Sequence, residues 1–305
     1  MARFTSPGLL NINKPEGMSS REVVDLVGST ARTRRVGHAG TLDPLATGVL
    51  VICLNWATRL VPFVQQLPKL YRAEFLLGQT SDTDDITGKV EQMPAVTRPA
   101  REEVERRLRG FVGRIQQVPP AHSAVHVGGR RAYELARQGE AVELAPRTVE
   151  VYRIELIEFD FPRVTVDIEC GSGTYVRSIG RDLGQALGCG ALMSALERRA
   201  IGRFRVEDAV LPAALRRDDF LSHLLPPITA VQHLPQFVCP PELLLALKQG
   251  RPLAAPAELM VTRPPQTAIV DQSGTLLGMA EPTPDGNSLQ PRHVFCGEPH
   301  PPQSG

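Results

Sequence analysis

A glycine-rich stretch near the N-terminus, GHAGTLDPLATG over residues 37–48, holds one acidic side chain, that of Asp43. Three glycines and a proline within these twelve residues oppose a regular helix, so we expect a shaped loop. An aspartate before a proline is most often a simple turn residue. Pro44 also favours an extended backbone at Asp43, which would aim the carboxylate in one direction. A carboxylate held in this way can act as a nucleophile or stabilise a developing positive charge.

Two histidines four residues apart, His122 and His126, superficially suggest one face of a metal site. No carboxylate or cysteine lies close to them in the sequence to complete a ligand set. We therefore expect no metal ion.

The composition indicates a soluble, cytoplasmic protein. Apolar residues make up 42% of the chain, and 34 basic against 33 acidic residues give a net charge of +1. Such a balance excludes a protein that coats nucleic acid through overall positive charge, so any nucleic acid must meet local basic patches. The five cysteines form no CxxC pair, which favours reduced thiols. We find neither a signal peptide nor an apolar run long enough to cross a bilayer.

Predicted elements on both sides of the loop would fix it to a rigid core. Residues 9–14 are typical of a short strand, and Ser19 with Glu22 forms a capping box that opens a helix. Residues 49–54 are an unbroken apolar run, typical of a strand buried on both faces. Binding and catalytic residues tend to collect on loops that a scaffold positions in this way.

The remaining pattern predicts an α+β fold with a mixed, mostly antiparallel sheet, because strands and helices do not alternate as βαβ units. The expected strands cover residues 69–78 and 164–170, and the expected helices cover residues 101–111, 133–138 and 174–187. An acidic turn is expected over residues 82–88.

The proline-rich residues 225–227 predict a boundary between a domain of residues 1–231 and a small β module of residues 232–305 with a loose tail. Within that module we expect a helix at 243–249 and strands at 267–270 and 275–279.

Several segments resemble one known family. GHAGTLDPLATGVL is similar to the catalytic signature of the TruB family of tRNA pseudouridine synthases. Four more segments resemble other motifs of that family: LLNINKPEGMSS, LYRAEFLLGQTSDTDDITG, RRAYELARQG and GSGTYVRSIGRDLGQALGCGA. They occur in the family's order over residues 9 to about 205. The C-terminal part is more weakly similar to the family's PUA-like RNA-binding module.

The resemblance implies an isomerase that converts uridine 55, in the T-loop of tRNA, to pseudouridine after flipping the base out of its stack. The N1–C1′ bond breaks and the uracil rejoins the sugar through C5. Neither redox change nor phosphoryl transfer is involved, so no cofactor is expected. As partner the resemblance implies the T-arm of tRNA, with no membrane, no guide RNA and no obligatory protein partner, and we expect a monomer.

The resemblance also implies roles for particular residues. Asp43 matches the catalytic carboxylate, and Tyr71 matches a tyrosine that stacks on the uracil and helps to move the C5 proton. Arg177 matches the arginine that pairs with the carboxylate and keeps it ionised, and we expect two parallel hydrogen bonds between them. Family positions near the substrate are matched by His38, Tyr175, Leu196 and Lys14. Lys14 could either shape the site or touch phosphate.

These residues also have structural interpretations. Tyr71 and Tyr175 could simply pack in the core. Arg177 could be a helix-surface charge paired with Asp182, and Leu196 could be a core leucine of a helix.

One segment departs from the family, which commonly has PPxYSAxK where this chain has PPAHSAVH at residues 119–126. Histidine replaces both the aromatic residue and the lysine, which puts the local RNA contact in doubt. Three other functions stay open: a guide-RNA-dependent pseudouridine synthase, a tRNA-folding chaperone and a nucleoside hydrolase. The first is disfavoured by the lack of basic tails, and the last by the lack of a water-activating cluster.

Overall fold

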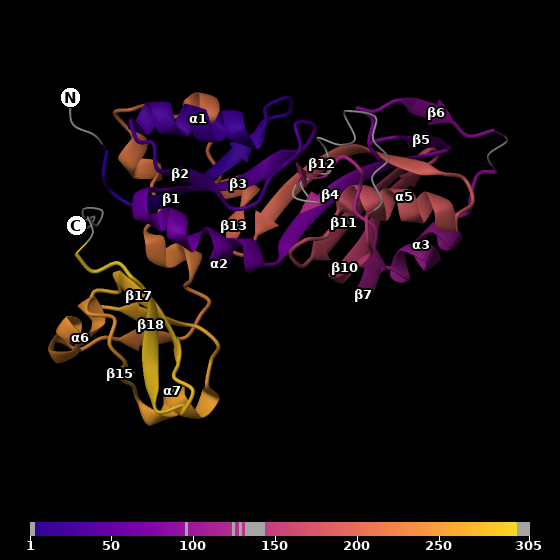
Figure 1. Cartoon of the computed structure of the whole chain (residues 1–305). Coiled ribbons are helices and arrows are strands. Elements are labelled where there is room, and N and C mark those ends of the chain that lie inside the picture. The colour runs from indigo at the N-terminus through magenta and orange to yellow at the C-terminus, as the bar shows by residue number, and fades with distance from the viewer. Residues whose placement is uncertain (1–3, 95–96, 124–125, 128–129, 132–143, 298–305) are drawn as a thin grey trace.

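In the computed structural model, the residues described are 4–94, 97–123, 126–127, 130–131 and 144–297. The helix expected at residues 133–138 lies outside them. A nine-stranded sheet runs through the larger part of the molecule in the order β1-β3-β12-β4-β11-β10-β7, with β2 beside β3 and β13 beside β12 (Figure 1). Its strands are β1 (Gly8–Lys14), β2 (Val36–His38), β3 (Thr47–Leu54), β4 (Lys69–Leu77), β7 (Gly113–Gln117), β10 (Arg147–Asp160), β11 (Arg163–Cys170), β12 (Ala191–Ile201) and β13 (Phe204–Arg205).

The sheet is mixed and mostly antiparallel, as predicted. Among its described pairs, only β3 and β12 run parallel. The predicted burial of β3 on both faces is confirmed: alternate residues of the strand belong to two different cores. Val49, Val51 and Cys53 join one core, and Leu50, Ile52 and Leu54 join the other.

Four helices of this part are described as α1 (Ser20–Ala31), α2 (Val61–Gln66), α3 (Arg101–Arg109) and α5 (Val176–Ala186). Ser19 and Glu22 form the predicted capping box at the start of α1. Helices α3 and α5 cover one face of the β4-β11-β10 region (Figure 1), and a shared core of Val104, Leu108, Ile179 and Leu183 with strand residues such as Phe75 and Val166 holds them there.

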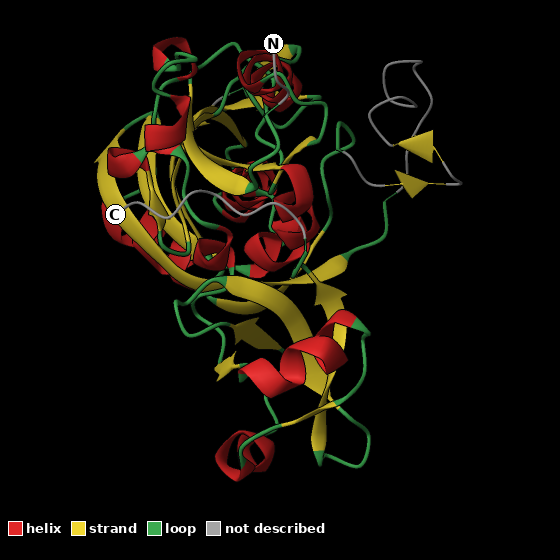
Figure 2. Ribbon diagram, turned by 90° about the vertical axis from the view of Figure 1, so that its left-hand side faces the viewer, coloured by secondary structure: helices red, strands yellow, loops and turns green. Residues whose placement is uncertain are grey.

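Two short strand pairs lie outside the main sheet. Strands β5 (Gln79–Ser81) and β6 (Val90–Gln92) pair on either side of the predicted acidic turn. Strands β8 (His126–Val127) and β9 (Arg130–Arg131) also pair, and Figure 2 shows them as two short arrows standing away from the body of the molecule.

A second, five-stranded sheet lies towards the C-terminus, in the order β14-β16-β17-β18-β15 (Figure 1). Its elements are β14 (Gln236–Val238), α6 (Leu244–Lys248), β15 (Leu253–Ala254), α7 (Ala257–Thr262), β16 (Thr267–Val270), β17 (Leu276–Pro282) and β18 (Ser288–Val294).

The two sheets share one hydrophobic core. Ala268, Leu276 and Phe295 of the C-terminal part belong to the same cluster as Val49. The Trp56 ring stacks on the Phe295 ring with the centroids 4.3 Å apart. The C-terminal sheet is therefore packed firmly against the N-terminal part. No helix in the described part of the chain is both long and apolar enough to cross a membrane.

Candidate active site

A cavity of about 1100 Å³ opens where the loop after β2 meets β4, β12 and the first turn of α5. Six of the seven predicted site residues line it: His38, Asp43, Tyr71, Tyr175, Arg177 and Leu196. These residues come from parts of the sequence more than a hundred positions apart, and the fold brings them to one place.

The loop that carries Asp43 is held to α1 and to the turn before it. The Ser20 hydroxyl donates to the Leu42 carbonyl at 3.0 Å and accepts from the Leu42 N–H at 2.9 Å. The Gly17 N–H donates to the Pro44 carbonyl at 2.8 Å. The Asp43 side chain itself is 39% exposed and faces the cavity. The predicted rigid loop with an aimed carboxylate therefore has a structural basis.

Two buried cations lie beneath the same loop. Lys14 is fully buried, and its ammonium donates to the carbonyls of Pro15, Met18 and Pro44 at 2.9, 2.6 and 3.3 Å. It does not line the cavity, so its position favours shaping the loop over touching phosphate.

Arg198 of β12 is the second cation, and our sequence analysis did not single it out. It is 2% exposed and donates to the carbonyls of Val49, Gly40 and Thr41 at 2.7, 3.0 and 3.4 Å. Side chains alternate along a strand, so Arg198 faces the same way as Leu196, whereas Arg199 faces the other way. That parity could have identified it had β12 been predicted as a strand.

Arg177 joins the Asp43 loop to the acidic turn. Its Nη2 lies 3.1 Å from Asp43 Oδ2, and its Nη1 lies 3.3 Å from Asp85 Oδ2. The guanidinium also donates to the carbonyls of Thr83 and His122 at 3.0 and 3.1 Å. Arg177 is 7% exposed, so it is no surface charge. Asp182 pairs instead with Arg181, at 2.9 Å.

The contact between Arg177 and Asp43 differs from our expectation of two parallel hydrogen bonds. One nitrogen, Nη2, faces the Asp43 carboxylate, while Nη1 is committed to Asp85 and to the Thr83 carbonyl. The guanidinium lies between two carboxylates and cannot present both nitrogens to one of them. Asp43 therefore shares the guanidinium of Arg177 with Asp85.

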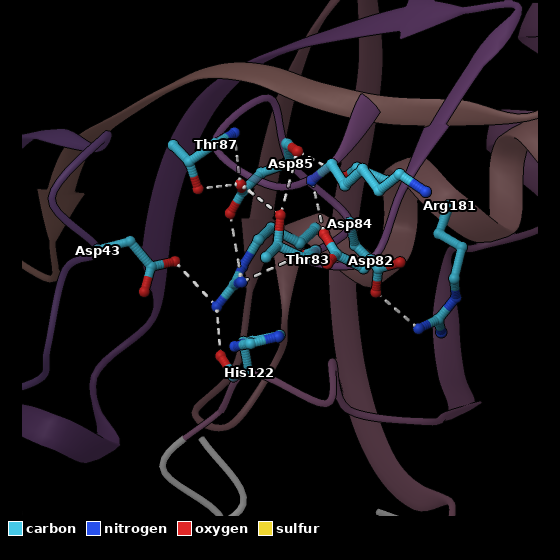
Figure 3. A network of polar contacts seen from close by, with 11 residues as sticks. Asp43, Asp82, Thr83, Asp84, Asp85, Thr87, His122 and Arg181 are labelled. Atoms are coloured by element: carbon cyan, nitrogen blue, oxygen red, sulfur yellow. Dashed lines mark hydrogen bonds and ion pairs between the residues drawn. The ribbon is translucent and has the colours of Figure 1, made fainter. Parts of the chain in front are cut away.

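Asp85 was not singled out from the sequence, where it read only as part of an acidic turn. It is 3% exposed, and its Oδ1 accepts from the Thr83 hydroxyl at 2.8 Å and from the Thr87 N–H and hydroxyl at 2.9 and 2.5 Å. Figure 3 shows Asp85 held between Thr83 and Thr87. Its Oδ2 is thereby aimed at Arg177. Its place in the segment that resembles the family's tyrosine motif was the available signal.

The cavity shifts the protonation equilibria of its side chains. Burial raises the pKa of Asp43 above its usual range, and the guanidinium of Arg177 acts in the opposite direction. Burial lowers the pKa of His38, so its imidazole is neutral at pH 7, and His38 Nδ1 is buried without a hydrogen-bond partner among the described residues. Burial also raises the pKa of the Tyr71 hydroxyl. Tyr71 and His38 therefore present uncharged rings to the cavity.

Tyr175 stands at the N-terminal end of α5, where Gln117 holds its backbone. The Tyr175 N–H donates to Gln117 Oε1 at 2.7 Å, and Gln117 Nε2 donates to the Tyr175 carbonyl at 3.0 Å. The Arg147 guanidinium lies 4.5 Å from the centre of the Tyr175 ring, a cation–π contact.

Lys69 was also missed, although it lines the cavity two residues before Tyr71 on β4. It is 7% exposed, its ammonium donates to the Gln65 carbonyl, and burial lowers its pKa to about 8.

Leu196 lies on strand β12, and our placement of it in a helix was wrong. Gly188 and Gly190 both have φ of +70°, a conformation that ends α5 and turns the chain into the strand. Leu196 is 9% exposed, packs in the core beneath α5 and borders the cavity.

Of the two histidines at positions 122 and 126, the structure describes the side chain of His122 alone. The His122 carbonyl accepts from Arg177. Within the described part of the chain, no three His, Cys, Asp or Glu side chains cluster closely enough to hold a metal ion.

Comparison with known sequences shows the family. Residues 29–176 match the family model described as TruB family pseudouridylate synthase (N terminal domain). A tRNA pseudouridine synthase B of Dehalococcoides mccartyi is 38% identical over 292 residues, which cover 94% of this chain and 96% of that protein. The chain belongs to the TruB family of pseudouridine synthases. As a member it is an isomerase. A tRNA pseudouridine synthase B of Heliobacterium mobile is 42% identical over 249 residues, 80% of each chain.

Solved structures agree with the α+β fold expected for this family. A chain from a structure of an H/ACA RNP bound to a substrate RNA containing 2′-deoxyuridine superposes with a TM-score of 0.71 at 25% identity, over 94% of this chain and 84% of that one. A chain from a Cbf5-Nop10-Gar1 complex gives a TM-score of 0.72 at 25% identity, over 96% and 85%. The predicted fold class is confirmed.

Proposed function

We propose that this enzyme converts a uridine of tRNA, uridine 55 in the T-loop, to pseudouridine, and that Asp43 performs the chemistry on a base flipped into the cavity. The observation that carries the proposal is the Asp43 carboxylate, which is open to the cavity and paired with the buried Arg177 at 3.1 Å. The names of the curated relatives support tRNA as the substrate.

The reaction places specific demands on the site. The uracil N1–C1′ bond breaks, the base turns, C5 bonds to C1′, C5 loses its proton and N1 gains one. Asp43 acts as nucleophile or stabilises positive charge as the bond breaks, and Arg177 keeps its carboxylate ionised. Tyr71 stacks on the uracil and takes part in moving the C5 proton. His38 fills the space that the base leaves, and Tyr175 and Leu196 wall the site.

The rest of the chain serves RNA binding in this proposal. Residues 1–231 form the catalytic domain, and residues 232–305 form a PUA-like module that adds RNA contacts. The enzyme acts as a cytoplasmic monomer on the T-arm, without cofactor, guide RNA or protein partner.

The test is tritium release from a C5-labelled tRNA transcript by the purified protein alone. We expect release by the wild type, and background release by Asp43→Asn, which keeps the side chain's shape and removes its charge. The variant should still bind tRNA. Substantial pseudouridine formation by Asp43→Asn would refute the role of Asp43, and a wild type that needs a guide RNA would refute the substrate assignment.

A further inference from the structure

A second, smaller cavity of about 340 Å³ adjoins the candidate active site. Gly171 and Ser172 line both cavities, so the turn after β11 is the wall between them. The smaller cavity is otherwise lined by residues of β7 and β10, including Arg114, Glu150 and Tyr152. The mechanism proposed above uses none of these three side chains.

Tyr152 lies on the same side of β10 as Thr148 and Glu150, which also line this cavity, and it stands at an irregularity in the strand. Val151 pairs with Cys170 and Arg153 pairs with Glu169, so Tyr152 is an extra residue in the strand, a β-bulge. Bulges re-aim side chains and recur beside active sites. The Tyr152 side chain is 45% exposed although it lies in the interior of a sheet strand. A Cβ added at Gly171 would lie 3.2 Å from the Tyr152 hydroxyl, so the tyrosine points towards the shared wall.

Two opposite charges flank the ring. Arg114 and Glu150 are cross-strand partners in the β7–β10 register, and both are exposed. Neither forms an ion pair with a described residue. Proteins bind unpaired nucleic acid with this combination of groups: a base stacks on an exposed aromatic ring, and a guanidinium contacts the phosphate.

We infer that the smaller cavity binds an unpaired nucleobase of the same RNA strand whose target uridine occupies the candidate active site. The base stacks on Tyr152, and Arg114 contacts the adjoining phosphate. Glu150 repels phosphate but accepts a hydrogen bond from an N–H group on the edge of the base. The wall between the two cavities carries a glycine at positions 171 and 173, which leaves room for the strand to cross. This inference rests on the proposed function.

The test combines a protein change with an RNA change. Stacking of one base on an aromatic ring corresponds to roughly a ten-fold change in dissociation constant. Tyr152→Ala should weaken binding of a T-arm stem-loop by about that factor, whereas Tyr152→Phe should bind as the wild type does. The single-turnover rate at saturating RNA should stay within about two-fold. Ile157→Ala is the matched control, since Ile157 is 40% exposed further along the same strand.

The RNA arm locates the base. A series of stem-loops carries one abasic nucleotide each, at a different unpaired position. For the wild type, we expect one of them to bind more weakly than the intact stem-loop, by about the factor that Tyr152→Ala causes. The Tyr152→Ala variant should bind that abasic stem-loop as tightly as it binds the intact one, because both changes remove the same contact. Arg114→Gln should weaken binding of every stem-loop similarly, because it removes a phosphate contact.

The outcomes separate this inference from the proposed function. A wild type that modifies no T-arm RNA refutes the proposed function. If the wild type is active and Tyr152→Ala binds as tightly as it does, the base-binding role is refuted while the proposed function stands. The role would also be refuted if every abasic substitution weakened RNA binding by the same factor in Tyr152→Ala as in the wild type. Should Tyr152→Ala fail to fold, the wild type with the abasic series and Arg114→Gln decide the matter.

Discussion

Asp43 and Arg177 show how one guanidinium controls the charge of the site at the scale of single residues. Burial pushes the pKa of Asp43 up, the neighbouring Asp85 pushes it the same way, and Arg177 opposes both. A carboxylate is ionised only above its pKa. The acid limb of the pH–rate profile therefore reports the pKa of Asp43, and with it the effect of Arg177 on that pKa.

Arg177→Ala should move the acid limb of the single-turnover rate to higher pH, because it removes the group that lowers the pKa of Asp43. It should also lower the free energy of unfolding by about 3–5 kcal/mol, since buried Asp85 loses its cation. Arg177→Lys should shift the limb less but slow the reaction, since one ammonium cannot hold two carboxylates and two carbonyls. The measurement is a pH profile with a C5-labelled transcript.

Arg181→Ala is the control, because Arg181 lies one turn along the same helix but pairs with Asp84 and Asp182. It should leave the acid limb in place. An unmoved limb in Arg177→Ala would contradict the charge role of Arg177.

Lys69 predicts a pH dependence of stability. Its pKa is about 8 in the folded protein against a usual value of 10.5, so between these two pH values the unfolded chain binds more protons. Stability contributed by this group therefore rises with pH across that window and is constant below it. At pH 7, below both values, burial of the charged ammonium costs about 3 kcal/mol.

Lys69→Met should therefore raise the free energy of unfolding by about 3 kcal/mol at pH 7, and by less at pH 9.5. Urea unfolding at the two pH values measures the difference. Lys248→Met, at an exposed position, should change stability little at either pH. A Lys69→Met variant whose stability gain is the same at both values would contradict the burial argument.

At the scale of elements, the close docking of α5 places Arg177. A Cβ added at Gly184 would lie 2.1 Å from the backbone nitrogen of Ala191, and one added at Gly180 would lie 2.5 Å from the Phe75 ring. Helix α5 therefore packs on β4 and β12 through two glycines. Arg177 is in the first turn of this helix, so any displacement of α5 moves the guanidinium away from Asp43.

Gly184→Ala separates packing from helix propensity. Propensity alone predicts a gain of about 1 kcal/mol from alanine in a helix, whereas the clash with the Ala191 backbone predicts a loss of about 1–3 kcal/mol. We expect the loss, together with a reduced single-turnover rate. Thermal unfolding and tritium release measure the two effects. Gln185→Ala, at the exposed neighbouring position, should change neither, and a stabilised Gly184→Ala enzyme would refute close docking.

At the scale of the whole molecule, the shared core couples the C-terminal sheet to the catalytic part. If residues 232–305 only added RNA contacts, removing them would weaken tRNA binding and spare turnover. The shared cluster instead predicts that truncation exposes Trp56 and the inner face of β3 and destabilises the whole chain.

Phe295→Ala tests this coupling without deleting the module. Removing a buried phenylalanine costs about 3–5 kcal/mol, and Phe295 is fully buried. The chain has one tryptophan, Trp56, so its fluorescence reports directly on the stacked pair. We expect a lower melting temperature and red-shifted emission. Val261→Ala, at a side chain 82% exposed in the same module, should change neither, and a Phe295→Ala protein as stable as the wild type would show that the two parts are independent.

The sequence by itself determined the local features. Strand β3 with its two buried faces, the capping box of α1 and the irregular loop around Asp43 all follow from the order of neighbouring residues, because apolar runs, caps and glycines act over a few positions. The resemblance to the TruB family named the other site residues, and six of the seven line one cavity. These statements need no knowledge of which strands become neighbours.

Only the tertiary structure decided what depends on strand order and on distant contacts. Arg177 meets Asp85 across 92 positions of sequence, and Arg198 supports the Asp43 loop across 158. No local pattern encodes such pairings, because many polar residues have the same local context. The strand containing Leu196 and the core shared by Trp56 and Phe295 were missed for the same reason. The hydrophobic effect is not directional, so an apolar side chain is stabilised by packing on any apolar partner of suitable size. The fold alone determines which partner is within reach.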